Sequence, residues 1–169
     1  MPDNQLAILV RMLVKENIRL RYLYLREKRL GRIDALTGVL SRRAIELVAA
    51  EEIRRRNRYV SPLTVALIDV DQFKSINDQF LYTGGDRVLI GLAQALNTSC
   101  RQTDRVGRLG GDEFLIVAPQ TDSSGAASLA ERIHAQVQTV SVCYDGQLIP
   151  LTVSVGLAVA DGAMIESCG

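Results

Sequence analysis

Two adjacent carboxylates follow a pair of glycines in the segment RLGGDEF at residues 108–114. Gly110 and Gly111 accept backbone angles that a side chain forbids, and they let a ligand come close to the main chain. Asp112 and Glu113 stand directly before an apolar run, where they can aim oxygens at a divalent cation. The pattern predicts a turn that binds metal and phosphate, although the segment alone could also form an ordinary acidic hairpin.

A second group of acids follows the apolar run at residues 63–68. A continuous apolar run that ends in acids predicts a central strand delivering carboxylates to its carboxyl end. If this strand pairs antiparallel with the strand that starts at Glu113, then Asp69 and Asp112 converge. Convergent carboxylates repel each other unless a cation lies between them. Asp71 is better explained as a turn acid.

Three motifs, in this order and spacing, resemble the GGDEF-domain family of diguanylate cyclases. They are DALTGVLSRR from Asp34, DVDQFKSIND from Asp69 and GGDEF from Gly110, and the resemblance extends to Ala158. It implies an α/β (α+β) fold similar to the palm of nucleotidyl cyclases and polymerases, with an antiparallel-containing central sheet flanked by helices. It also implies condensation of two GTP molecules into cyclic di-GMP with release of two pyrophosphates.

The resemblance assigns roles to the residues at matching positions. A divalent ion, Mg²⁺ or Mn²⁺, would be bound by the carboxylates of Asp69 and Asp112 and by the backbone carbonyl of Val70. Glu113 would bind a second ion, and Asp112 would accept the proton of the attacking 3′-hydroxyl. A metal-bound carboxylate is a poor base at neutral pH, so activation by metal alone stays an open alternative. Lys74 matches the family's phosphate-contacting lysine, although lysines are commonly exposed for no functional reason.

Guanine recognition needs acceptors for N1–H and the amino group and a donor for O6. Asn77 and Asp86 match the family positions for this role; without the resemblance they would pass for a helix cap and a first-turn acid. The chain departs from the family at Leu81-Tyr82, where Gly-His is usual. We expect Tyr82 to pack against the base or donate through its hydroxyl, and Leu81 to reshape the rim of the pocket.

A regulatory motif lies shortly before the Gly-Gly pair. Arg101 and Asp104 form an RxxD sequence at the offset where the family carries its product-inhibition site. An arginine can bind guanine and phosphate with its forked donors, and an aspartate can accept from the guanine edge. Arg132 resembles the arginine that a neighbouring domain adds to this site. The RxxD pattern alone occurs often by chance.

The first thirty residues differ in character from the rest. Leucines and basic residues alternate there in steps of three and four, which predicts one long amphipathic helix. Glu16 and Glu27 interrupt the apolar seam, so the helix is either packed on its own domain or part of a parallel dimeric stalk below an upstream sensor absent from this chain. We expect a signalling, coiled-coil-like helix at 1–33 and a GGDEF domain at 34–169.

The carboxyl end departs from the family pattern. The family continues past the strand near residue 155 with a helix whose Lys and Arg bind phosphate, whereas this chain ends at Gly169. The sequence therefore predicts an apparent truncation, which is either a fragment boundary or a missing wall of the site. In the second case, the chain would be a weak or inactive cyclase.

Composition narrows the class of protein. The chain has 169 residues, 47% of them hydrophobic, which suffices for one core and an appendage. Twenty basic and nineteen acidic residues give a net charge of +1, without the basic excess of a non-specific nucleic-acid binder. Three cysteines without metal-ligand spacing indicate reduced thiols and a cytoplasmic location. No membrane-spanning segment is visible in the sequence.

Periodicity predicts the remaining elements. We expect helices at 42–58, 73–79, 85–97 and 126–140, strands ending at 69 and spanning 105–109 and 114–118, and a hairpin turning at 145–146 with its return arm at 151–157.

The sequence thus predicts a diguanylate cyclase that uses Mg²⁺ or Mn²⁺ and acts as a homodimer, because each domain presents only one GTP. A catalytically weak or inactive module that binds GTP or cyclic di-GMP and regulates a partner is the main alternative. A structural dimerisation domain would explain the helix but not the acids.

Overall fold

The computed structural model describes residue 11, residues 14–19 and residues 31–161. The chain divides into two compact units, Met1–Arg32 and Ile33–Gly169. Residues 14–19 are helical; the rest of the predicted long amino-terminal helix, like the last eight residues of the chain, lies outside the described residues. No helix in the described part is long and apolar enough to cross a membrane.

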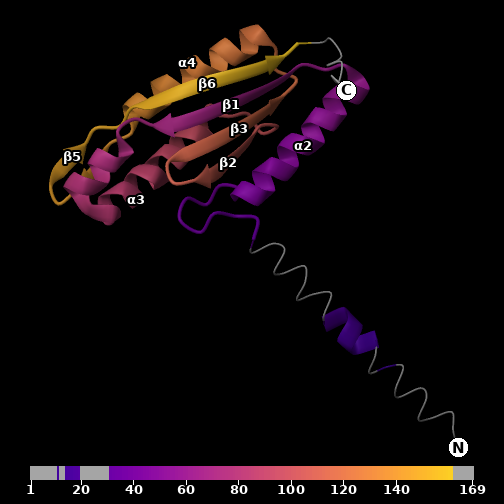
Figure 1. Cartoon of the computed structure of the whole chain (residues 1–169), viewed down its shortest axis with the longest axis horizontal. Helices are drawn as coiled ribbons and strands as arrows, with labels where there is room; N and C mark the ends of the chain where they lie inside the picture. Colours follow the sequence, from indigo (N-terminus) through magenta and orange to yellow (C-terminus); the bar gives the residue numbers. More distant parts are fainter. Residues whose placement is uncertain (1–10, 12–13, 20–30, 162–169) are drawn as a thin grey trace, which may run out of the picture. The chain divides into compact units, whose positions relative to one another are not determined.

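The second unit mixes helices and strands (Figure 1). Its elements in chain order are α2 (Arg42–Tyr59), β1 (Leu63–Val70), α3 (Phe73–Ser99), β2 (Arg105–Gly110), β3 (Glu113–Pro119), α4 (Ser123–Thr139), β4 (Val142–Tyr144), β5 (Gln147–Ile149) and β6 (Val153–Ala160).

The main sheet has the strand order β2-β3-β1-β6, and every neighbouring pair is antiparallel. Strand β1 lies inside the sheet between β3 and β6, which explains its nearly continuous apolar sequence. Its register with β3 runs from Leu63 opposite Pro119 to Asp69 opposite Glu113. The predicted antiparallel pairing is therefore confirmed, and the acidic end of β1 meets the start of β3.

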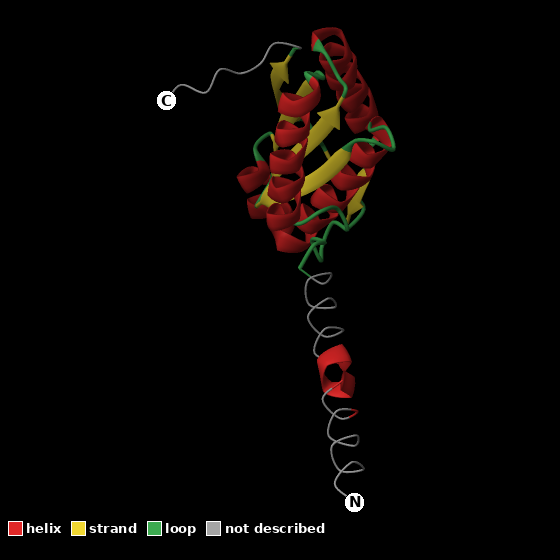
Figure 2. Cartoon of the chain, turned by 90° about the vertical axis from the view of Figure 1, so that its right-hand side faces the viewer, coloured by secondary structure: helices red, strands yellow, loops and turns green. Residues whose placement is uncertain are grey.

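Helices lie on both sides of this sheet (Figure 2). One face contributes Ile68, Phe114 and Ile116 to a large core with α3 and α4. The other face contributes Leu63 and Val117, which pack with Ile45 of α2. Because successive strand residues point to opposite faces, these side chains supply two cores from the same strands. The sheet is thus held between two helical layers, and its strand ends are left to carry the acids.

Two predicted elements differ from the structure. The hairpin that turns at Asp145-Gly146 returns through β5, whereas the predicted return arm belongs to β6 and pairs with β1. The reason is local: both turn residues have positive φ, 52° and 78°, the form that closes a two-residue hairpin, so Tyr144 pairs directly with Gln147. Helices predicted at 73–79 and 85–97 form one element, α3, with a kink between them.

Candidate functional site

The Gly-Gly turn connects β2 to β3 at the end of the sheet. Gly110 has φ 145° and Gly111 has φ 55°, and the ladder between the two strands shifts register between Arg108 and Gly110. Beyond the glycine and its two chain neighbours, no atom lies within 4 Å of the position that a Cβ would take on either residue. Both glycines suit these backbone conformations, Gly110 most strictly, and the open space leaves room for a ligand beside the main chain.

The predicted acids converge at this turn. Asp69 lies directly opposite Glu113 in the ladder. The pKa of Asp69 is raised, first by burial and then by the charges of Asp112 and Glu113. The neighbouring negative charges add to the effect of burial on Asp69, so a cation between the carboxylates would be favourable.

The oxygen donors predicted here suit a divalent cation that binds together with substrate. Within the described ranges no group of three or more His, Cys, Asp or Glu side chains is arranged to hold a metal on its own. Mg²⁺ is usually bound through one or two carboxylates, with waters and substrate phosphates completing its shell. Asp69 and Asp112 supply such carboxylates, and Val70, the last residue of β1, carries the carbonyl predicted to join them.

Asp71 has a separate structural role. Its carboxylate accepts a hydrogen bond of 2.7 Å from the Ser154 hydroxyl, and its backbone N–H donates to the Thr152 carbonyl at 3.0 Å. Hydrogen bonds from Ser154 and Thr152 lower the pKa of Asp71. The carboxylate therefore fastens the end of β1 to the start of β6, as expected of a turn acid.

Arg108 is an important residue that the sequence did not reveal. Its Nε and Nη2 donate to the Gly111 carbonyl at 3.0 and 2.6 Å, and its Nη1 lies 3.2 Å from Asp34 Oδ1. Burial alone would raise the pKa of Asp34, but hydrogen bonds from Thr37 and Arg108 outweigh it, so the pKa is lowered. The arginine before the glycines and the acid of the DALTG motif were the signals available in the sequence.

The residues predicted to bind guanine lie on both sides of the kink in α3. Asn77 precedes it and Asp86 follows it. The two halves approach closely, because a Cβ added to Gly85 would collide with Asn77 Oδ1. Lys74 is exposed on the first turn of α3, and the side chain of Tyr82 is 81% exposed at the kink. The structure thus brings Asn77 beside the glycine that precedes Asp86.

The kink itself is formed by a residue poorly suited to it. Leu81 has φ 60° and ψ 172°, a backbone conformation that is essentially restricted to glycine. Such a conformation costs about 1–3 kcal/mol for a residue with a side chain. Leu81 is 64% exposed, so packing of its own side chain offsets little of this cost. Contacts made elsewhere must hold the kink.

The three residues of the predicted product-inhibition site lie around the carboxyl end of α3. Asp104 is only 7% exposed, and its carboxylate accepts from the backbone N–H of Arg101 at 2.8 Å. Arg132 donates from Nε to the Ser99 carbonyl at 3.0 Å. Burial, with the charge of Asp104 as a smaller cause, raises the pKa of Cys100 to about 12, while Arg132 acts in the opposite direction. Asp104 and Arg132 therefore both lie within electrostatic range of Cys100.

Comparison with known sequences gives one family. The pattern described as "Diguanylate cyclase, GGDEF domain" matches residues 32–167. Diguanylate cyclase DosC of Escherichia coli K12 is 38% identical over 131 residues, which are 77% of this chain and 28% of that protein. The chain thus spans about a quarter of the length of this relative.

Solved structures agree with the sequence comparison. Diguanylate cyclase SiaD of Pseudomonas aeruginosa, solved with its activator SiaC, superposes with a TM-score of 0.75 at 34% identity, covering 93% of this chain and 60% of SiaD. The coiled coil and GGDEF domain of DgcB from Caulobacter crescentus, solved in complex with c-di-GMP, gives a TM-score of 0.81 at 23% identity, covering 93% of this chain and 84% of that one. The second likeness shows the fold alone.

Proposed function

The chain belongs to the GGDEF-domain family of diguanylate cyclases, and we propose that it condenses two GTP molecules into cyclic di-GMP and two pyrophosphates. The observation that carries the proposal is the register of β1 with β3, which sets Asp69 opposite Glu113 beside the Gly-Gly turn. Mutually repelling carboxylates at an open turn suit a cation and a polyanion together. The chain spans about a quarter of the length of its relative DosC, so the proposal extends to the activity of the whole protein.

In this reaction the 3′-hydroxyl oxygen of one GTP bonds to the α-phosphorus of the other, and the bond to pyrophosphate breaks. Asp112, half-buried beside the turn, is proposed to accept the hydroxyl proton. Lys74, exposed at the start of α3, is proposed to contact phosphate as a point charge. Asn77 and Asp86 are proposed to hold the guanine edge, because together they offer one donor group and several acceptors.

Diguanylate cyclases of this family use a divalent metal, and Mg²⁺ or Mn²⁺ is proposed here at Asp69, the Val70 carbonyl and Asp112, with Glu113 near a second ion. When bound, such an ion would neutralise triphosphate charge and acidify the attacking hydroxyl. The position of the positive charge would be set by the carboxylates of this chain, which lie at the end of β1 and the start of β3.

Two GTP molecules must face each other, so the catalytic assembly is proposed to be a two-fold homodimer. One domain presents one nucleotide, and each 3′-hydroxyl must reach the α-phosphorus held by the partner. The rate per subunit should therefore increase with protein concentration below the dissociation constant of the dimer. A rate per subunit that stays constant down to concentrations at which the protein is monomeric would count against this assembly.

Product inhibition is proposed at Arg101, Asp104 and Arg132. The exposed guanidinium of Arg101 is available for guanine or phosphate. Arg101→Ala should weaken cyclic di-GMP binding and relieve inhibition without lowering the initial rate, as progress curves with added product would show. Arg42→Ala is a matched control, because Arg42 is an exposed arginine of α2 that pairs with Glu46 of the same helix at 2.9 Å. An Arg101→Ala enzyme inhibited as strongly as the wild type would contradict the assignment.

The deciding experiment is incubation with GTP and Mg²⁺ or Mn²⁺, with chromatographic detection of cyclic di-GMP. Product formation that depends on the metal supports the proposal, and its absence from the full chain favours a second function. That second function is a module that binds GTP or cyclic di-GMP without turnover and regulates a partner. The strained Leu81 and exposed Tyr82 at the guanine segment favour it, and calorimetry with each nucleotide would detect the binding.

A further inference from the structure

The β4–β5 hairpin contacts α3 directly after the kink. The Thr83 hydroxyl donates to the Tyr144 hydroxyl at 2.7 Å. Arg87 donates from Nη1 to the Cys143 carbonyl at 2.8 Å, and its guanidinium carbon lies 5.3 Å from the centroid of the Tyr144 ring. Thr83 and Arg87 are four residues apart and so share one face of the helix. Three polar contacts thus join two consecutive hairpin residues to a single turn of α3.

The hairpin is a firm support for these contacts. Its inward side chains, Val142 and Ile149, are buried in the main core together with Phe80 and Val88 of α3.

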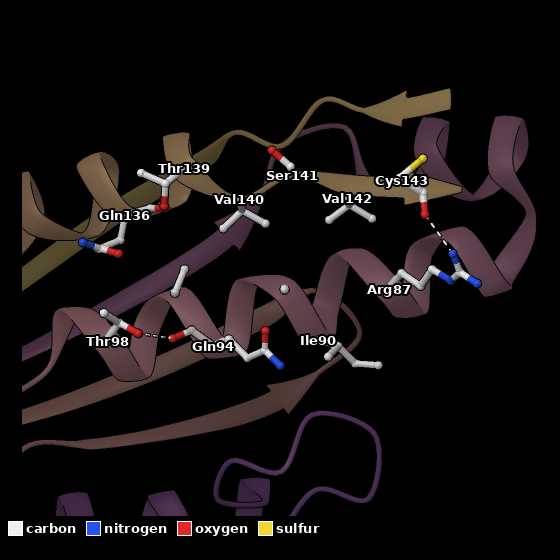
Figure 3. A pocket seen from close by; sticks show the side chains of 12 residues that line it. Arg87, Ile90, Gln94, Thr98, Gln136, Thr139, Val140, Ser141, Val142 and Cys143 are labelled. Atoms are coloured by element: carbon white, nitrogen blue, oxygen red, sulfur yellow. Dashed lines mark hydrogen bonds between the residues drawn. The ribbon is translucent and has the colours of Figure 1, made fainter. Parts of the chain in front are cut away.

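Figure 3 shows Arg87 reaching from α3 to Cys143 at one end of a groove. This groove has a volume of about 450 Å³ and runs between α3 and residues 139–143. Its described lining includes none of the predicted site residues, and nothing in it identifies a ligand.

The turn of α3 that the hairpin holds is the turn that carries the guanine-binding segment. Tyr82 is followed directly by Thr83, and Asp86 is followed directly by Arg87. Contacts that fix Thr83 and Arg87 therefore also restrict Tyr82 and Asp86. On the other side of this segment is Leu81, whose backbone conformation is costly for any residue but glycine. Without contacts from outside α3, the backbone at Leu81 would relax to a less costly conformation, and Asp86 would move relative to Asn77.

We propose that the β4–β5 hairpin is a positioning element for nucleotide recognition, in which Tyr144 and Arg87 hold the kink at Leu81 and so set the spacing between Asn77 and Asp86. This inference rests on the proposed binding of guanine by those two residues. Neither Tyr144 nor Arg87 touches the substrate; both act through the segment that does.

The test uses the full chain and Tyr144→Phe, which removes the hydroxyl and keeps the ring. One hydrogen bond corresponds to a factor of about 3 to 10, so amide hydrogen exchange at residues 82–87 should accelerate by about that factor. The KM for GTP should rise by a similar factor while kcat changes by less than about twofold. The reason is that contacts to guanine are weakened equally in the ground state and in the transition state. Thr83→Val should reproduce both effects, and combining it with Tyr144→Phe should add nothing further.

Rescue distinguishes positioning from general stability. Leu81→Gly placed in the Tyr144→Phe protein should return both the KM and the exchange rates towards wild type, because a glycine needs no external hold. Thr98→Ala is the control, since its hydroxyl bonds within α3 to the Gln94 carbonyl, remote from the kink. Unchanged exchange at 82–87 in Tyr144→Phe, or failure of Leu81→Gly to reverse the effects, would overturn the inference. If the wild type neither binds nor converts GTP, the proposed function fails, and the exchange measurements still decide whether the hairpin holds the kink.

Discussion

The Gly-Gly turn and the kink at Leu81 are two segments of the candidate site with positive φ, and they are built in opposite ways. At Gly110 and Gly111 the residue type suits the conformation, and open space surrounds the main chain. At Leu81 the residue type opposes the conformation, although its side chain is mostly exposed. The first segment is specified by local sequence, whereas the second is imposed by contacts with a distant hairpin.

The two segments also differ in how they are anchored. The turn is held by Arg108, which donates to the Gly111 carbonyl and pairs with Asp34. Next to the kink, the side chains of Thr83 and Arg87 donate to the Tyr144 hydroxyl and the Cys143 carbonyl, which are neutral acceptors. An ion pair therefore supports the segment that presents the acids, whereas the segment predicted to read the base is supported by hydrogen bonds to neutral acceptors.

The largest expected effect comes from removing the charge that the Gly-Gly turn presents. Asp112→Asn keeps the side-chain volume but replaces a carboxylate by an amide, so metal placement and proton acceptance are both lost. Turnover should fall by at least a hundredfold, about 3 kcal/mol of activation free energy. Cyclic di-GMP formation measured by chromatography checks this, with Asp145→Asn at the hairpin turn as a control. Unchanged turnover in Asp112→Asn would exclude the proposed site.

The next effect distinguishes the two glycines by their backbone angles. Gly110, with φ 145°, lies where a side chain is strongly disfavoured, whereas Gly111, with φ 55°, lies in the left-handed region that asparagine tolerates. Gly110→Ala should lower the free energy of unfolding by about 1–3 kcal/mol, and Gly111→Asn by less than about 1 kcal/mol. Denaturant unfolding of both variants checks the order. Equal losses would mean that crowding and not backbone conformation governs the turn.

The sequence predicted those features that depend on local pattern. The apolar run of β1 and its terminal acids were enough to predict a strand that meets the start of β3, and the ladder between Asp69 and Glu113 confirms that pairing. The positions of α2, β2 and β3 followed from periodicity in the same way. The roles of individual site residues, the domain boundary and the long amino-terminal helix stay predictions.

The features that were missed depend on partners distant in sequence. Arg108 and Asp34 are separated by 74 positions, so no local pattern connects them. The alternation at residues 153–160 indicated a strand but not its partner. This strand, β6, pairs with β1 and not with the nearer β4, because β1 offers an eight-residue ladder. A break in α3 was expected, but a glycine-type angle at a leucine contradicts local preference and requires tertiary contacts.

A smaller effect, of opposite sign, is expected at the kink. Leu81→Gly removes a conformational cost of about 1–3 kcal/mol and adds a chain-entropy cost of about 0.5–1 kcal/mol. The free energy of unfolding should therefore rise by about 0.5–2 kcal/mol, as measured by denaturant unfolding. Leu148→Gly is the matched control, because that leucine is 69% exposed in β5 and is not among the residues with positive φ; its replacement should be destabilising. Loss of stability in Leu81→Gly would show that the leucine is not strained.

The smallest effect separates the two anchors by their response to pH. The folded-state pKa of Asp34 lies below its ordinary value of 3.8. Its contribution to stability is therefore present above that pH and is lost as the pH falls through the folded-state pKa. Asp34→Asn should lower the free energy of unfolding at pH ~7 by about 0.5–1.5 kcal/mol, and its difference from wild type should shrink as the pH is reduced to ~3. The gain from Leu81→Gly should stay constant over the same range, because the conformational cost at Leu81 lies in the backbone and involves no proton. Urea unfolding of the three proteins across this pH range measures both trends, and a constant deficit in Asp34→Asn would show that its carboxylate does not anchor the turn through charge.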